Sequence, residues 1–480
     1  MLTTEGGYFS VTEKTRHLRR VLRVKITALS LQMGINDYER RIVWYADYGT
    51  KNAAVQYMQK SEYLLYGGFN NAKIVFGTVE NIFANNENVS CKVRLENLIP
   101  ATEYIYRVGD GINFDNKTYC FFTQSKDILN RSFAVISDLH CMYKPDAPHL
   151  WEYRRPQWNN TINSINAYDP NIAFLLSAGD NISSYNMGMD DEKEKMRLIC
   201  EKEHEFLFEP ELMKNLAFAT VMGNHEAQYY NDADHYSSPA HCHYDMPNDD
   251  SISGHFKYDT AGDFCFQSGN VLVIGINFTV DGAANRPNTD FESTERYVKK
   301  AVELYPDALW RVMITHIQGF TFIGDSKEVE TPYMMKKQDE LCSKYNIDLM
   351  LTGHAHGFSR SYPIKDGEPI KNTTENINGV DTVLNANATV HYNIPSALNH
   401  SFTSVFGQYK KYLKSYGVAK MRSENPIMPK DITEYDSPMF LHIKVDETKE
   451  QNSMLIKVIQ SKDLVSVDDF RIVKYKKKNV

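Results

Sequence analysis

The spacing of hydrophobic residues changes near residue 128 of the chain. Before that point, short apolar segments are separated by turn residues, and the segments 41–45 and 54–57 predict two paired strands of a half-buried sheet. In residues 103–108, two tyrosines and a valine occupy every second position, which is the period of a sandwich strand. This part of the chain therefore predicts an all-β module.

After residue 128, strand-like segments alternate with stretches that predict helices at residues 158–167, 193–215, 291–305 and 334–345. This alternation is typical of an α/β domain whose functional residues follow the carboxyl ends of strands. Residues 436–475 return to strand-like segments, which we expect to complete a sheet of the same domain. Residues 365–435 are rich in Asn, Ser and Tyr and predict a loop-rich insertion near the site.

The length of 480 residues is enough for two domains with large cores. We therefore predict an N-terminal β-sandwich over residues 1–127 and an α/β domain over residues 128–480, which includes the strands in 436–475.

The composition argues against several classes of function. A net charge of -8 argues against a nucleic-acid partner, which would require a basic face, and no apolar stretch approaches the roughly 20 residues that span a bilayer. Seven cysteines without CxxC spacing argue against a disulfide framework and a structural zinc site. Residues 1–20 contain no apolar segment of a signal peptide, which favours the cytoplasm.

Five apolar, strand-like segments end abruptly in residues that bind metals through oxygen or imidazole nitrogen. These donors are Asp138, His140, Asp180, Asn224, His316, His354 and His356, with His225 directly after Asn224. Two ions about 3.5–4 Å apart can clamp a phosphoryl group, and a carboxylate between them offsets their repulsion. We expect Asp180 to be this bridge, because Gly179 before it lets the backbone approach closely.

Each fragment alone occurs by chance, whereas the ordered set does not. The other histidines lack such a motif, and we predict structural or surface roles for His204, His235, His241, His243, His255, His391 and His400. The run His241-Cys242-His243 suggests a metal site only superficially, since the sequence shows no partner residues for it. Cys141 follows His140 directly and is expected either to pack or to act as a further ligand.

Together these residues resemble the calcineurin-like metallophosphoesterase superfamily, in particular its purple acid phosphatase branch. Residues 353–363 match the branch's Gly-His-x-His-x-aromatic-x-Arg-x-x-Pro run, and residues 256–277 are similar to its strand pair after Gly-Asn-His-Glu. The sequence Pro100-x-Thr102-x-Tyr104 is similar to the corner of fibronectin type III domains, where a tyrosine hydroxyl bonds to the backbone. The resemblance implies a metallophosphoesterase β-sandwich flanked by helices, preceded by a fibronectin type III-like domain.

The resemblance also implies a role for each donor. One ion would be held by Asp138, His140, Asp180 and His356, and the second by Asp180, Asn224, His316 and His354. His225 would lie outside the ligands, near the ester oxygen, as general acid or charge stabiliser. The implied reaction is the in-line attack of a metal-bound hydroxide on phosphorus.

Two departures from the purple branch are coupled. Ser183 stands where the branch has the tyrosine that binds ferric iron, with Tyr185 two places later, while His140 is an additional donor. A neutral imidazole stabilises ferric iron less than a phenolate does. We therefore predict a colourless enzyme with two divalent ions, of Fe, Mn or Zn.

The leading hypothesis is a phosphomonoesterase acting on small phosphoesters. The alternatives are a phosphodiesterase or nucleotide hydrolase with the same site, and a non-catalytic binding protein. The segments 141–157 and 365–435 are expected to control substrate access, and Arg154 or Arg155 either binds the substrate phosphate or is solvated. The resemblance implies export, against the absence of a visible signal peptide, so the sequence leaves localisation open, and the oligomeric state as well.

Overall fold

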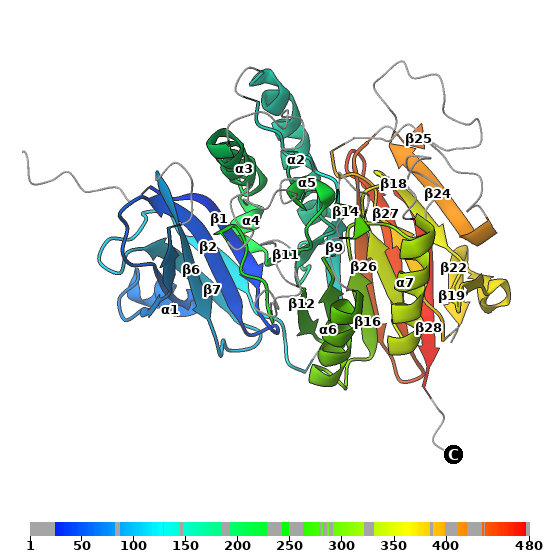
Figure 1. Cartoon of the computed structure of the whole chain (residues 1–480). Helices are drawn as coiled ribbons and strands as arrows, with labels where there is room; N and C mark the ends of the chain where they lie inside the picture. The colour runs from blue at the N-terminus through cyan, green and yellow to red at the C-terminus, as the bar shows by residue number, and fades with distance from the viewer. Residues whose placement is uncertain are drawn as a thin grey trace, which may run out of the picture.

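The computed structural model places a β-sandwich beside a larger body of two sheets and several helices (Figure 1). The described residues are 25–81, 87–127, 129–144, 147–183, 193–227, 242–248, 263–277, 280–281, 286–287, 291–320, 331–384, 387–398, 411–419, 434–435 and 437–476.

The N-terminal part contains two layers of antiparallel strands. One layer comprises β1 (Thr27–Met33), β2 (Arg40–Asp47), β6 (Asn88–Leu95) and β5 (Thr78–Glu80). The other comprises β4 (Lys73–Phe76), β3 (Ala54–Gln59), β7 (Glu103–Gly109) and β8 (Tyr119–Phe122), and helix α1 (Lys60–Tyr66) follows β3.

The predicted pairing of segments 41–45 and 54–57 is wrong, although both are strands. β2 pairs with β1 and β6, whereas β3 pairs with β4 and β7 in the other layer. The chain crosses between the layers in residues 48–53, and the hydrophobic pattern of a strand does not specify which layer it joins.

The tyrosine corner is confirmed. The hydroxyl of Tyr104 accepts a hydrogen bond from the backbone N–H of Ile99 at 2.9 Å. Its ring stacks on Phe121 of β8, with 5.3 Å between the ring centroids. This arrangement fixes the entry into β7, as expected of a fibronectin type III-like corner.

The larger body contains two mixed sheets packed face to face. The first continues from β1 through β11 (Phe218–Thr220), β10 (Leu175–Ser177), β9 (Arg131–Ile136), β26 (Met439–Glu447), β27 (Gln451–Gln460), β28 (Ser466–Tyr475), β22 (Val380–Leu384) and β21 (Thr374–Ile377). The second has the order β12 (Phe264–Ser268), β13 (Val271–Gly275), β16 (Trp310–Ile314), β17 (Leu349–Thr352), β23 (Val390–Asn393), β18 (Gly357–Ser361), β24 (Leu413–Ala419) and β25 (Glu434–Tyr435). Their inner faces meet where the rings of Phe174 and Phe266 lie 5.1 Å apart, in an edge-to-face contact.

Helices cover the outer faces of this sandwich. In Figure 1, α6 (Phe291–Leu304) and α7 (Thr331–Tyr345) lie over the second sheet, and their buried side chains share a core with strands β13, β16 and β17. The helix α2 (His149–Tyr168) buries Trp158, Ile162 and Ile165 against the first sheet. The remaining helices are α3 (Lys193–Leu207), α4 (Leu212–Asn215) and α5 (Asn224–Ala227). The architecture therefore confirms the predicted β-sandwich flanked by helices.

The predicted helices are found with different bounds. The predicted helix 193–215 is two helices, because Pro210 has no N–H to donate to the preceding turn. Helix α2 begins nine residues before the predicted start at residue 158 and contains Pro156.

Among the helices that the structure describes, none is both long and apolar enough to cross a bilayer.

The C-terminal strands complete the first sheet as predicted, because β26 pairs antiparallel with β9 from Arg131 to Val135. The prediction of a loop-rich insertion over residues 365–435 is wrong in part. β22 pairs with β28, and β23 lies between β17 and β18 in the second sheet. Its sequence Val-His-Tyr-Asn gave no strand signal, because polar residues occupy half of it. Residues 385–386, 399–410, 420–433 and 436 lie outside the described part.

The two parts of the chain are joined by hydrogen bonds and ion pairs. β1 pairs with β11 at Gln32 and Phe218, and Arg131 forms a buried ion pair of 2.9 Å with Asp37. The division at residues 127 and 128 stays a prediction.

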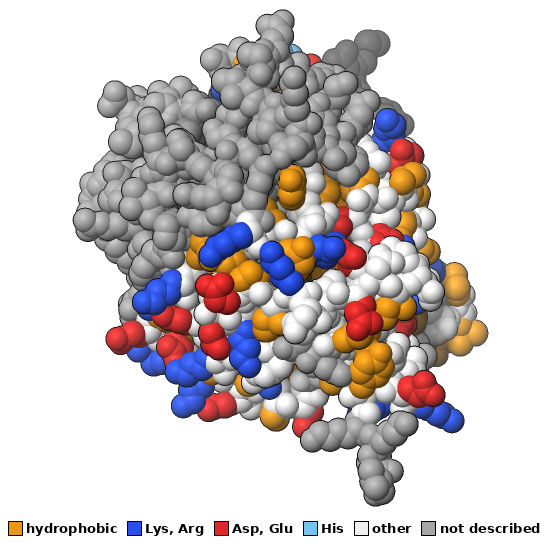
Figure 2. Space-filling view, turned by 90° about the vertical axis from the view of Figure 1, so that its right-hand side faces the viewer, with side chains coloured by type: hydrophobic (Ala, Val, Ile, Leu, Met, Phe, Trp, Pro, Cys, Tyr) orange, Lys and Arg blue, Asp and Glu red, His pale blue; other side chains and the backbone are white. Residues whose placement is uncertain are grey.

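On the face in Figure 2, acidic and basic side chains are interspersed among the described residues.

Candidate metal centre

All five donor motifs lie directly after strands whose carboxyl ends point to one place. Strands β9, β10 and β11 run parallel in the first sheet and are followed by Asp138 and His140, Asp180, and Asn224. Strands β16 and β17 run parallel in the second sheet and are followed by His316, and by His354 and His356. The two sets meet where the N–H of His354 donates to both carboxylate oxygens of Asp138 at 3.1 Å.

The backbone at these donors is in an unusual conformation. Five of them have positive φ, between 47° and 67°: Asp138, His140, Asp180, His354 and His356. Left-handed backbone costs a non-glycine residue about 1–2 kcal/mol, so the surrounding structure has to hold it. Cross-strand hydrogen bonds do so, from Asp138 N–H to Gly179 O at 3.0 Å and from His140 N–H to Asp180 O at 2.9 Å.

The first group of donors comprises Asp138, His140, Asp180 and His356, all buried, with one donor atom of each within 4.8 Å of the others. Nε2 of His140 lies 3.0 Å from Nε2 of His356, which lies 3.4 Å from Oδ1 of Asp138. Oδ2 of Asp180 is 3.8 Å from Nε2 of His140.

The second group comprises Asp180, His316 and His354, and Asn224 joins it. Oδ1 of Asn224 lies 2.9 Å from Nε2 of His316 and 2.8 Å from Nδ1 of His354. Oδ2 of Asp180 lies 3.2 Å from Nε2 of His316. Asp180 is thus shared by both groups, in the position expected of a bridging carboxylate.

The chemistry of these atoms fits a cation. The carbonyl of Ala178 only accepts hydrogen bonds and lies 2.7 Å from Nδ1 of His316, so that nitrogen carries the proton. Nε2 then faces the oxygens of Asp180 and Asn224, and these buried acceptors require a positive charge, which is either a second proton on the ring or, in its place, a cation bound by the lone pair of Nε2. Burial alone would lower the pKa of His316, but the Asp180 carboxylate outweighs it and raises the pKa to about 9.

His225 lies beside the two groups without belonging to either. Its backbone N–H donates to Oδ1 of Asp180 at 2.8 Å, and its Nε2 is 3.9 Å from Oδ2 of Asp180. Its ring meets that of His140 edge to face, with 4.5 Å between centroids. The side chain is 17% exposed, more than that of Asp180, His140 or His316. A proton on this imidazole can therefore reach a ligand that enters from solvent.

Glycines allow the two loops around Asp180 to touch. A Cβ on Gly223 would lie 2.0 Å from Oδ1 of Asp180, and a Cβ on Gly179 would lie 2.5 Å from the backbone nitrogen of Gly223. Gly179 also has a φ of 89°. The expected close approach at Gly179 is confirmed.

The sequence motifs did not show what holds the Asp180 loop. The buried carboxylate of Glu226 accepts N–H bonds from Gly223 at 2.7 Å, Asp180 at 3.0 Å and Asn181 at 2.7 Å. Burial raises the pKa of Glu226 to about 7, and the Asp180 carboxylate adds to this effect. The motif Gly-Asn-His-Glu contains this residue, but nothing in the sequence indicates that its partners are backbone N–H groups.

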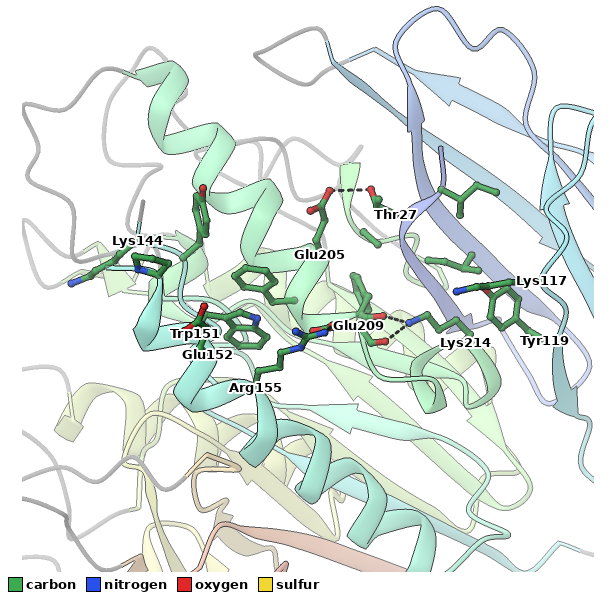
Figure 3. A pocket seen from close by; sticks show the side chains of 17 residues that line it. Thr27, Lys117, Tyr119, Lys144, Trp151, Glu152, Arg155, Glu205, Glu209 and Lys214 are labelled. Atoms are coloured by element: carbon green, nitrogen blue, oxygen red, sulfur yellow. Dashed lines mark hydrogen bonds and ion pairs between the residues drawn. The ribbon is translucent and has the colours of Figure 1, made fainter. Parts of the chain in front are cut away.

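The two arginines considered as ligands of a substrate phosphate, Arg154 and Arg155, make different contacts. Nη1 of Arg154 donates to the carbonyl of His140 at 2.6 Å, so this side chain holds a donor loop. Arg155 pairs with Glu209 at the edge of a cavity of about 540 Å³ between α2, α3 and β1 (Figure 3), and no residue of either donor group lines this cavity. Cys141 is buried, and its N–H donates to the carbonyl of Asn181 at 2.8 Å. Its thiol belongs to neither group.

Of the remaining candidate residues, those that the structure describes lie outside the two donor groups around Asp180. Ser183 donates its N–H to Glu203 at 3.2 Å, and Tyr185 lies outside the described residues, as do His235, His241, His255 and His400. His391 is buried beside Phe320, 4.4 Å between the ring centroids. His204 and His243, expected to be structural, meet Cys200 in a third group of possible metal donors.

Comparison with known proteins bears on the family and the fold of the part of the chain that carries these groups. Residues 131–358 match the family model described as calcineurin-like phosphoesterase. A search of curated protein sequences gave no match. Among solved structures, the chain is similar to the purple acid phosphatase PPD1 from yellow lupin (Lupinus luteus) seeds, with a TM-score of 0.65, 15% identity and coverage of 94% of this chain and 74% of that chain.

A second solved structure is GAP50, the anchor in the inner membrane complex of Plasmodium, with a TM-score of 0.38, 14% identity and coverage of 73% of this chain and 90% of that chain. A TM-score of 0.38 is too low to support a common fold. The lupin structure, by contrast, confirms the fold of this chain.

Proposed function

This chain carries a calcineurin-like phosphoesterase domain, and we propose that it is a metal-dependent hydrolase of small phosphate monoesters. The observation that carries the proposal is the convergence of buried acceptor atoms on Oδ2 of Asp180. The two donor groups that share Asp180 come from five separate loops, that of Asp180 included, and a role in folding alone does not account for so many buried ligand atoms facing one another.

We propose that Asp138, His140, Asp180 and His356 hold one divalent ion, and that Asp180, Asn224, His316 and His354 hold the second. When bound, two such ions supply a nucleophile at neutral pH and neutralise charge on the phosphoryl oxygens. The protein keeps the donors in register: the carbonyl of Ala178 orients His316, and Arg154 orients the loop of His140.

His225 is proposed to act on the leaving group. Its ring lies next to the shared carboxylate and is partly open to solvent, so Nε2 can hold a proton at the ester oxygen of a bound substrate. Donation of that proton to the departing alkoxide is general acid catalysis. Substitution His225→Gln is expected to lower kcat for substrates with poor leaving groups much more than for para-nitrophenyl phosphate, whose leaving group needs little protonation.

The preference for monoesters is supported by the similarity to a purple acid phosphatase and stays the finer part of the proposal. A phosphodiesterase with the same donors is the alternative. Hydrolysis of para-nitrophenyl phosphate and of its bis-ester should be compared with and without chelator, with Mn, Fe(II) or Zn supplied. Faster turnover of the bis-ester would favour the diesterase, and no turnover of either would favour a non-catalytic binding protein.

Substitution Asp180→Asn tests the metal centre itself. The variant removes the carboxylate that both groups share, so metal content and turnover are expected to fall together, each by at least ten-fold. Asp169→Asn is a matched control, because Asp169 pairs with His442 outside the donor groups. Retained turnover in Asp180→Asn would contradict the assignment.

We also propose that the ions are divalent and the protein colourless. His140 supplies an imidazole in the first group, 3.8 Å from Oδ2 of Asp180, and a neutral imidazole stabilises ferric iron less than a phenolate. A charge-transfer band in the visible spectrum of the purified protein would contradict this.

A further inference from the structure

Three side chains that the phosphoesterase site does not use converge between helix α3 and the segment 242–248. Cys200 and His204 lie one helical turn apart on α3, and His243 comes from the segment. Sγ of Cys200 lies 3.7 Å from Nδ1 of His204 and 3.9 Å from Nε2 of His243. All three side chains are buried.

We propose that Cys200, His204 and His243 form a third metal site, which binds a thiophilic ion of the zinc class. Zinc binds thiolate sulfur at about 2.3 Å and imidazole nitrogen at about 2.0–2.1 Å, so the sulfur and nitrogen of a tetrahedral site lie roughly 3.5 Å apart. The two distances from Cys200 are within a few tenths of an ångström of this value. No residue of this site belongs to the donor groups around Asp180.

The outer nitrogens of both rings have partners that orient them. Nε2 of His204 lies 3.0 Å from the hydroxyl of Tyr244, and Nδ1 of His243 contacts the hydroxyl of Tyr45 on β2. Metal-binding histidines are usually oriented by a hydrogen bond to the nitrogen that does not bind the metal. A tyrosine hydroxyl both donates and accepts, so it can hold the tautomer whose other nitrogen faces the sulfur.

Binding requires a small rearrangement. Nδ1 of His204 lies 2.7 Å from the carbonyl of Cys200, and the two imidazole rings are stacked with 3.7 Å between centroids. To bind an ion, His204 gives up this carbonyl contact, its proton moves from Nδ1 to Nε2, and the ring turns so that both lone pairs converge. The Cys200 thiol releases its proton to solvent.

The surrounding charge favours a cation. The carboxylates of Glu203 and Glu201 act on the sulfur of Cys200. A divalent ion bound there would offset their charge together with that of the thiolate.

The position of this site indicates a structural role. The carbonyl of His243 accepts a hydrogen bond from Gln32 of β1 at 3.1 Å, and Tyr45 lies on β2. Next to His204, Glu205 accepts a hydrogen bond from Thr27 of β1 at 3.0 Å (Figure 3). An ion here would therefore fasten helix α3 to the N-terminal sandwich.

Cobalt titration of the full chain tests the proposal. The protein is freed of metal with a chelator and titrated with Co²⁺ while the near-ultraviolet spectrum and the bound cobalt per chain are measured. A thiolate-to-cobalt charge-transfer band is expected, which nitrogen and oxygen donors do not produce. Cys200→Ser is expected to lose the band and one equivalent of cobalt, while hydrolysis of para-nitrophenyl phosphate is retained.

Cys242→Ser is the matched control, since Cys242 is also buried but lies outside the group, and it is expected to keep the band. Asp180→Asn is expected to keep the band as well, which separates this site from the phosphoesterase site. If Cys200→Ser fails to fold, His243→Gln is expected to weaken cobalt binding at least ten-fold. A wild-type protein without the band, or a band that persists in Cys200→Ser, overturns the proposal.

Discussion

The carboxylate of Glu226 accepts the backbone N–H of Asp180 at 3.0 Å, and so fastens the loop of the shared donor to the turn that carries Asn224 and His225. The same carboxylate accepts N–H bonds from Gly223 and Asn181. The sheet brings the donors near one another, and this buried acid holds the backbone of the Asp180 loop.

Substitution Glu226→Gln tests this relationship. The amide keeps the shape but turns an NH₂ group toward backbone N–H donors, so buried N–H groups lose their acceptor and the free energy of unfolding is expected to fall by about 1–3 kcal/mol. Metal affinity is expected to fall roughly ten- to a hundred-fold, as for partners that orient ligands. Urea unfolding and metal titration measure the two effects. Glu152→Gln, at an exposed position of α2, is the control and should change neither.

The neighbouring arginines of α2 should behave differently. Arg154→Met removes the bond to the carbonyl of His140 and leaves that oxygen without its guanidinium donor, so it is expected to cost about 1–3 kcal/mol of stability and to weaken metal binding. Arg155→Met removes a pair with Glu209 in which the arginine is 53% exposed, and the expected change is under about 1 kcal/mol. Equal metal affinity in the two variants would show that Arg154 does not position the site.

The tyrosine corner should affect stability without affecting catalysis. Tyr104→Phe removes the hydroxyl that accepts the N–H of Ile99, and the expected loss of unfolding free energy is about 1 kcal/mol. Denaturant unfolding measures this loss, and kcat for para-nitrophenyl phosphate should be unchanged. Tyr66→Phe, at an exposed position of α1, serves as control. A fall in kcat in Tyr104→Phe would instead link the N-terminal sandwich to the site.

Acid should weaken the contact between the N-terminal sandwich and the segment 242–248. Burial alone would raise the pKa of Asp245, but Arg94 and Arg41 outweigh it and hold the pKa below the ordinary value of 3.8. A pKa that is lower in the folded state gives stability above the unfolded value, and this stability is lost as pH falls through the folded value. The Asp245 contribution is therefore expected to be complete above about pH 5 and to be lost progressively as pH falls below 3.8 towards the lower pKa of the folded state.

Asp245→Asn identifies this contribution. The variant removes the charged partner of Arg94 and one of the two carboxylates that pair with the buried Arg41, the other being Glu39, so the expected cost at neutral pH is about 1.5–3 kcal/mol. Between about pH 6 and about pH 3, the unfolding free energy of Asp245→Asn should change less than that of the wild type. Parallel pH profiles for the two proteins would assign the acid sensitivity to other carboxylates.

Local properties of the sequence were sufficient for most element types and for the residues that gather around Asp180. Hydrophobic periodicity predicted the helices and the C-terminal strands, because an amphipathic face is visible within one segment. Motif order predicted the donors around Asp180, and Pro-x-Thr-x-Tyr predicted the corner at Tyr104. Residue type limits which metals such donors can bind and which reactions they can serve, and residue type is known from the sequence alone.

Tertiary structure alone decided relations between distant residues. β2 and β3 carry similar patterns yet join different layers, and β23 enters the second sheet despite its polar composition. Cys200 and His243 are 43 residues apart and meet only because α3 packs against the segment 242–248. Partner choice, burial and the convergence of acceptor atoms depend on contacts between segments far apart in the chain, and periodicity within one segment carries no information about them.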